Sequence, residues 1–221
     1  MSFFTPHTDN VAAGLGASGT WIKDTGIYEI VILYLSVEQG NEQAIRLNLN
    51  YKLVENDTTG TLYGLSIRNR DGKPNFQAEI FNNLCIIADI KDSVKEPVRQ
   101  VVDLPRMGSK ELNVLEQFSN LKVKVRVQAE YSRYEGEIRE NMRICNFFRA
   151  HDNKSAREIA TGKDLGDYAN ESRIREPYYR DSVSKEEVER WKQARLGSTS
   201  NDLGKRLSAS DLEEEGEDTP F

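Results

Sequence analysis

An acidic run near the end of the 221-residue chain is the stretch whose residue types most clearly point to a binding role. Residues 211–218 hold six carboxylates and no cation. Such a segment cannot bury enough apolar surface to offset the entropy lost on ordering, so we expect it to be mobile. It offers a partner a belt of negative charge, then a Phe ring whose terminal carboxylate an Arg or Lys can bind. The expected contact residues are Asp211, Glu213, Glu214, Glu215, Glu217, Asp218, Pro220 and Phe221.

The net charge of the chain is concentrated in this run. The sequence has 30 Lys and Arg against 36 Asp and Glu, a formal charge of −6. Without the six acids of 211–218, 30 acids remain against 30 cations. The rest of the chain is therefore neutral, and a neutral chain can still carry the basic face that nucleic-acid binding requires.

Hydrophobic periodicity predicts the elements that position these groups. Residues 27–37 are β-branched and aromatic, as in a strand buried on both faces. Four more segments alternate between apolar and polar residues, which predicts half-exposed strands at 44–54, 61–68, 121–130 and 138–148. In this pattern Tyr28, Tyr34, Tyr51, Tyr63 and Tyr131 share faces with aliphatic residues, so we expect most of them in the core.

A change of period separates the third strand from the fourth. Phe76, Ile80 and Leu84 recur at helical spacing, which predicts a helix over 74–89. Residues 91–120 are charged and irregular, and we expect a loop or insertion that ends in a short helix at 111–118.

Three strands, a helix and two strands are the order of a five-stranded Greek-key barrel of the OB type, with the helix between strands three and four. We therefore expect a mainly β fold, although an α+β meander has the same order and stays open. The expected organisation is a flexible arm at 1–20, the OB domain at 21–150, a polar extension at 151–196, and a linker with the acidic tail at 197–221.

One helix is expected in the polar extension, at 184–196. Ser184 and Glu187 form a capping box ahead of an apolar stripe that contains Trp191. This stripe packs either on the barrel or on a second subunit, so a homo-oligomer stays open.

The tail resembles that of a known family. Its order of acidic run, Asp218, Pro220 and final Phe221 closely resembles the acidic tip of bacterial single-stranded-DNA-binding proteins. Single-stranded-DNA-binding proteins of tailed phages also end in an acidic tail with a terminal Phe. The resemblance covers residues 211–221. It implies an OB core that protects single-stranded DNA during replication, recombination or repair. It also implies a tail that competes with DNA for the basic groove and recruits a polymerase, helicase or primase.

OB domains bind strands across their second and third strands and through the loops joining strands one to two and four to five. Binding without sequence preference needs cations along the backbone and flat side chains on which bases stack. The alternation places Lys122, Lys124 and Arg126 on one face, to which the paired strand adds Arg139 and Arg143. The full set of expected single-stranded-DNA contacts is Trp21, Arg46, Lys52, Arg68, Arg70, Lys122, Lys124, Arg126, Arg133, Tyr134, Arg139 and Arg143.

Enzyme signatures are weak in this sequence. Gly14, Gly16 and Gly19 have dinucleotide-motif spacing but lack the strand before and the helix after that the motif needs. His7 and His151 have no second ligand at metal spacing. We expect no catalysis, no cofactor and no metal. With no long apolar run and no signal-peptide pattern, we expect a cytoplasmic protein, in the host cytoplasm if phage-encoded.

Two other functions stay open. One is an OB-fold adaptor that binds only protein, and the other is an RNA-binding OB protein.

Overall fold

The computed structural model of the chain describes residues 21–40, 42–91, 93–104 and 108–195. The predicted arm at 1–20 and the predicted linker and tail at 197–221 lie outside these residues. The chain divides into two compact units. Within the described residues, unit 1 contains 21–129 and 141–177, and unit 2 contains 130–140 and 178–195.

The predicted mainly β fold is confirmed. The described residues form an eight-stranded sheet with the order β3-β2-β1-β5-β4, in which β6 pairs with β1, β7 and β8. The strands are β1 (Gly26–Gln39), β2 (Ile45–Leu53), β3 (Thr59–Arg68), β4 (Val98–Leu104), β5 (Gly108–Val114), β6 (Leu121–Tyr134), β7 (Glu137–Arg149) and β8 (Tyr178–Tyr179).

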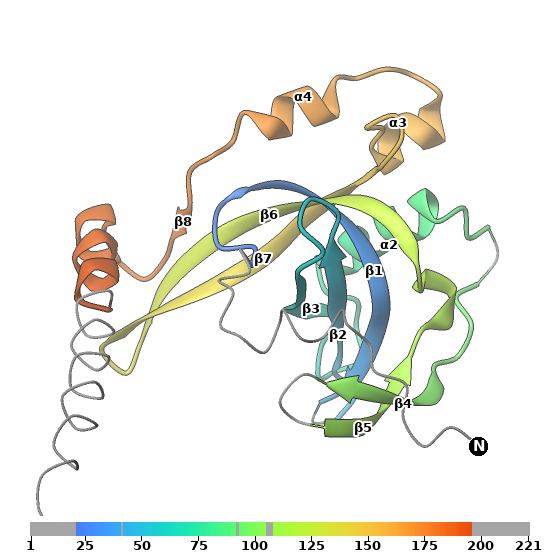
Figure 1. Cartoon of the computed structure of the whole chain (residues 1–221), viewed down its shortest axis with the longest axis horizontal. Helices are drawn as coiled ribbons and strands as arrows, with labels where there is room; N and C mark the ends of the chain where they lie inside the picture. The colour runs from blue at the N-terminus through green and yellow to red at the C-terminus, as the bar shows by residue number, and fades with distance from the viewer. Residues whose placement is uncertain (1–20, 41, 92, 105–107, 196–221) are drawn as a thin grey trace, which may run out of the picture. The chain divides into compact units, whose positions relative to one another are not determined.

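Strand β1 organises unit 1. It pairs antiparallel with β2 along Ile30–Gln39, and on its other edge with β6 along Gly26–Ile32 (Figure 1). Beyond β6, the same edge pairs with β5 at Ser36 and Val37. Because β6 returns to lie beside β1, the order β6-β1-β2-β3 is that of a Greek key.

The sheet is not closed into a barrel. Among the described residues, no strand pairing joins β3 to β7, the contact that would close the ring of strands. An OB-type barrel is therefore not confirmed.

Residues 91–120, expected to be a loop or insertion that ends in a short helix, contain a hairpin, so the loop interpretation is wrong for most of this length. Strands β4 and β5 form a regular antiparallel hairpin, and the helix is reduced to a 3-10 turn, η2 (Glu116–Phe118). Val98 and Val101 are exposed on this hairpin. A ribbon that faces solvent on both sides lacks the alternation that reveals a half-buried strand.

Helix α2 (Ala78–Ile87) confirms the predicted helix between the third strand and its successors. Ile80, Leu84 and Ile87 are its buried residues, and its Phe81 ring lies 5.5 Å from the Phe118 ring. They join the core side chains that the strands contribute, which include Ile30, Ile32, Leu35, Leu47, Leu49, Leu62, Leu65, Val123, Val125 and Phe147.

Two further helices follow β7, and the sequence pattern did not predict them. They are α3 (Ala156–Thr161) and α4 (Asp167–Ser172). Ser155 and Glu158 form a complete capping box at the start of α3, and Gly162 ends this helix with a φ of 70°. The buried Glu158 carboxylate also accepts the Leu165 N–H at 2.8 Å, which fixes the turn between the two helices.

Unit 2 combines the end of the β6–β7 hairpin, β8 and a helix over residues 185–195. The predicted capping box is confirmed, because the Ser184 N–H donates to Glu187 at 2.9 Å and the Glu187 N–H to Ser184 Oγ at 3.2 Å. Tyr131 is buried at its centre, with the rings of Tyr179 and Trp191 at 5.8 and 6.4 Å. Trp191 thus packs within unit 2.

No helix in the described part of the chain is long and apolar enough to cross a membrane.

Candidate nucleic-acid interface

The side of the β1-β2-β3 sheet turned away from the core carries mainly polar side chains. We call this surface the outer face, and it is formed by Tyr34, Ser36, Glu38, Arg46, Asn48, Asn50, Lys52, Thr61 and Tyr63. Its rows follow the strand register, in which Tyr34 pairs with Asn50 and Asn50 with Thr61. The outer face belongs entirely to unit 1.

Two irregularities in strand pairing place tyrosines on the outer face. The β1–β2 register shifts between Ile32 and Tyr34, and the β2–β3 register shifts so that Leu47 pairs with Leu65 but Leu49 with Leu62. Both leucines of β3 are buried, which leaves Tyr63 65% exposed between them. The prediction that Tyr63 shares a strand face with core aliphatic residues is therefore wrong, because a β-bulge changes which residues face the core.

Tyr34 and Tyr63 lie near each other on this surface. Partial burial, and to a smaller extent the neighbouring Tyr63, raises the pKa of the Tyr34 hydroxyl. Neither tyrosine is expected at the surface from the sequence pattern. Gly64, which follows Tyr63 and has a φ of 77°, is the local signal that could have revealed the bulge.

Amide side chains order the middle of the outer face. Asn48 Oδ1 accepts the Gly64 N–H at 3.0 Å, and Thr61 Oγ1 donates to Asn50 Oδ1 at 2.7 Å. These bonds hold the backbone beside Tyr63 in place. The aromatic ring is thus supported by a fixed strand and not by a free loop.

Cations flank the tyrosines. Arg46, Arg68 and Arg70 are exposed, and among the described residues no ion pair engages any of the three guanidinium groups. Arg68 pairs in register with Ile45, and the Arg70 carbonyl accepts the Gln43 N–H, so both arginines lie beside the start of β2. Lys52 lies at the other end, with its ammonium 2.8 Å from the Asp57 carboxylate.

Two more exposed aromatic side chains belong to unit 1. Trp21, an expected contact, is 57% exposed and precedes Ile22, which is buried and donates its N–H to Tyr51 Oη at 3.4 Å. Phe76 is 63% exposed, with the Arg143 guanidinium 5.4 Å from its ring centre. Its predicted place in the apolar stripe of the helix is wrong, because α2 begins only at Ala78.

The lysines of the expected basic face on β6 already contact other groups of the protein. Lys122 and Lys124 point to the same carboxylate, Glu29, at 2.6 and 3.7 Å, and these lysines lower the pKa of Glu29. The Lys124 ammonium also donates to Asn153 Oδ1 at 2.6 Å and lies 5.4 Å from the Tyr168 ring centre. Residues 153–168 therefore cover part of this face.

The prediction that Arg126 lies on an exposed strand face is wrong. Its side chain is 2% exposed, and it donates to the Val127 carbonyl oxygen. Burial raises the pKa of both Tyr28 and Glu171, and the charge of Arg126 partly offsets each rise, which places Arg126 among groups from β1 and α4. A guanidinium enclosed in this way cannot reach a nucleic-acid backbone.

Three expected contacts belong to unit 2. The Arg133 guanidinium lies 2.9 Å from the Glu187 carboxylate, and the Arg139 guanidinium lies 4.0 Å from the ring centre of Tyr134, which is 52% exposed. Glu135 and Gly136 form the turn between β6 and β7, with φ values of 52° and 84°. The outer face and these three residues are therefore in different units.

The predicted partner-binding residues of the tail have no described position in the structure. The tail residues 211–221 lie outside the described residues. Within the described ranges, no group of three or more His, Cys, Asp or Glu side chains is arranged to hold a metal ion. Neither a protein-family model nor a curated protein sequence matches this chain.

Proposed function

We propose that this protein binds single-stranded DNA without strong sequence preference, with the outer face of unit 1 as the principal contact surface. The observation that carries the proposal is Tyr63, a largely exposed aromatic ring on a strand, beside Tyr34 and on the same face as Arg46, which pairs with Ser66 of β3. A base stacks on such a ring whatever its identity, while arginines neutralise the phosphates.

The proposed fold is an open form of the OB type. The support is the Greek-key order β6-β1-β2-β3 and a helix before β6, together with the fact that OB barrels are partly open. In that fold strands two and three form the binding surface, which corresponds to β2 and β3 here. Trp21 and Phe76 are two further exposed aromatic rings of unit 1.

The acidic tail has a separate part in this proposal. It recruits replication or recombination proteins, and it competes with DNA as a flexible chain of negative charge. Because the tail is covalently attached, its effective concentration near the outer face is high even when its affinity is low.

A gel shift of the full chain with oligo-dT, oligo-U and duplex DNA at two salt concentrations tests the proposal. We expect oligo-dT to bind more tightly than duplex, and binding to weaken with salt with a log-log slope of about −0.7 per phosphate neutralised. A clear preference for oligo-U would favour an RNA-binding protein. Binding to none of the three would favour an adaptor that contacts only protein.

A further inference from the structure

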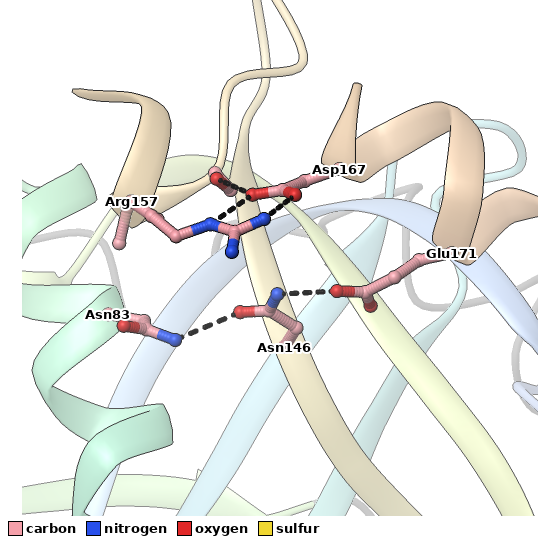
Figure 2. Close-up of a pocket in the computed structure, with 7 residues that line it drawn as sticks. Asn83, Asn146, Arg157, Asp167 and Glu171 are labelled. Carbon is pink, nitrogen blue, oxygen red and sulfur yellow. Dashed lines mark hydrogen bonds and ion pairs between the residues drawn. The ribbon is translucent and has the colours of Figure 1, made fainter. Parts of the chain in front are cut away.

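Unit 1 contains a polar cavity that is separate from the outer face. Its volume is about 320 Å³, in the lower range of small-ligand pockets. Side chains from α2, β7, α3 and α4 surround it, together with Ser155 at the N-cap of α3 (Figure 2). They are Asn83, Asn146, Ser155, Ala156, Arg157, Asp167 and Glu171.

One side of the cavity is a row of two amides and a carboxylate. Asn146 Oδ1 accepts both the Phe147 N–H at 2.9 Å and Asn83 Nδ2 at 3.1 Å. Because a backbone N–H fixes the oxygen, the Asn146 amide nitrogen must face Glu171, to which it donates at 2.7 Å. The row therefore has a defined polarity, with the Glu171 carboxylate as an acceptor at its end.

The other side of the cavity is a clamped guanidinium. Arg157 donates from Nε and Nη2 to the two oxygens of Asp167, and Ser155 Oγ donates to Asp167 at 2.6 Å. Figure 2 shows the remaining guanidinium nitrogen of Arg157 without a dashed bond, on the side of the Asn83-Asn146-Glu171 row. Arg157, whose side chain is 66% exposed, thus presents a planar group that Asp167 orients at the edge of the cavity.

The surroundings of Glu171 disfavour its ionised form. Burial raises the pKa of its carboxyl group, and the Asn146 hydrogen bond and the charge of Arg126 only partly compensate, while Asp167 adds to the rise. Among the described residues Asn146 is its only hydrogen-bond donor, so the second carboxylate oxygen is available to a ligand. A Gln would keep the Asn146 bond without the charge. A charged group kept at a cost to stability is typical of a binding site.

We propose that this cavity binds a guanine base. Guanine presents two adjacent donors, N1–H and N2–H₂, which fit the two oxygens of one carboxylate, and its O6 acceptor lies directly beside them. Glu171 would accept one donor on its free oxygen and the other on Oε1, whose second lone pair lies beside the Asn146 bond, and the free N–H groups of Arg157 would donate to O6. Single-stranded bases are commonly read in this way, along the Watson–Crick edge and against arginine planes.

The other bases fit the cavity less well. Adenine and cytosine each offer a carboxylate a single amino group beside an unprotonated ring nitrogen, and the N3–H of uracil or thymine is flanked by two carbonyl oxygens. Each of them leaves a carboxylate oxygen unpaired or facing an acceptor, and an unpaired buried polar group costs about 1–3 kcal/mol. The site is therefore expected to discriminate between bases, which the outer face is not.

Calorimetric titration of the full chain with GMP, AMP, CMP and UMP tests this assignment. We expect GMP to bind at least about tenfold more tightly than the others, equivalent to the loss of one hydrogen-bond pair. Glu171→Gln should remove the preference for GMP, and Asn83→Ala should weaken GMP binding. Asn83→Ala leaves the Asn146 oxygen bonded to the Phe147 N–H, so this variant should fold.

Glu176→Gln is the matched control, because it makes the same chemical change on an exposed residue of unit 1. It should bind GMP like the wild type. Equal binding of all four nucleotides, no binding of any, or a GMP preference that survives in a folded Glu171→Gln would each overturn the proposal.

A guanine can come from a free nucleotide or from a base within a strand. An oligo-dT with one central dG distinguishes these sources, because only the second predicts an affinity gain over plain oligo-dT that depends on Glu171. Plain oligo-dT contains no guanine, so its binding tests the proposed function alone. The GMP titration uses no strand, so the two proposals can fail separately.

Discussion

Leu62 and Leu65 both point into the core of unit 1 although they lie three positions apart on β3. In a regular strand, residues at that spacing face opposite sides. The bulge that brings both inward turns Tyr63 outward, next to Tyr34. The proposed stacking surface thus depends on this irregularity and on the one between Ile32 and Tyr34 in the β1–β2 pairing.

Replacing Tyr63 with Ala should weaken single-stranded DNA binding. One lost stack is worth about 1–3 kcal/mol, or about 5- to 150-fold in Kd. Tyr63→Phe keeps the ring and should bind like the wild type. Fluorescence anisotropy with labelled oligo-dT measures both variants. Equal weakening by Ala and Phe would assign the effect to the hydroxyl and contradict the stacking role.

Arg46→Gln should reduce the salt dependence of binding. If Arg46 neutralises one phosphate, the slope of log K against log salt should fall in magnitude by about 0.7. Lys163→Gln, a matched change at an exposed position between α3 and α4, should leave the slope unchanged. An unaltered slope in Arg46→Gln would remove this residue from the interface.

Arg126→Met should behave in the opposite way to Arg46→Gln. Because the Arg126 side chain is buried, its loss removes a hydrogen bond and a charge that faces Glu171. We expect a loss of about 1–3 kcal/mol in unfolding free energy and no change in the salt slope. Urea denaturation and anisotropy on one sample measure the two quantities. A reduced salt slope in the folded variant would return Arg126 to the nucleic-acid interface.

The difference in stability between Glu171→Gln and the wild type should depend on pH. The folded pKa of Glu171 lies above its ordinary value of 4.5, so the ionised carboxylate destabilises the folded wild type at neutral pH. This penalty disappears as the pH falls through the raised pKa towards 4.5. Without ligand, the variant should melt above the wild type at pH 7, and the difference should vanish below about pH 4.5. Thermal melts of both proteins between pH 4 and 7 measure whether the variant is the more stable one at neutral pH.

Removing residues 211–221 should tighten binding to single-stranded DNA, most at low salt, because competition by the acidic tail is then lost and such competition is screened by ions. Phe221→Ala keeps all six acids and should bind DNA like the wild type while losing recruitment of the partner protein. Anisotropy and a pull-down with replication proteins measure the two effects. Unchanged or weaker DNA binding after truncation would contradict competition.

The local sequence was enough to predict most of the elements. The strands β2, β3, β6 and β7 and the helix α2 follow from side-chain periodicity, because burial of one face imposes a period of two on a strand and 3.6 on a helix. Strand β1 follows from its β-branched and aromatic composition. The capping box at Ser184 and Glu187 was equally readable, since its bonds join residues three apart. The acidity of residues 211–218 is likewise a property of the sequence alone.

Only the tertiary structure decided which of these side chains meet solvent or one another. Tyr63 faces outward because of how β3 pairs with β2, and Arg126 is buried among groups that include Glu171, which lies 45 positions further along the chain. The cavity joins residues from 83 to 171, so no local pattern could reveal it. Periodicity reports the average burial of a segment, whereas bulges and long-range packing determine the exposure of each residue.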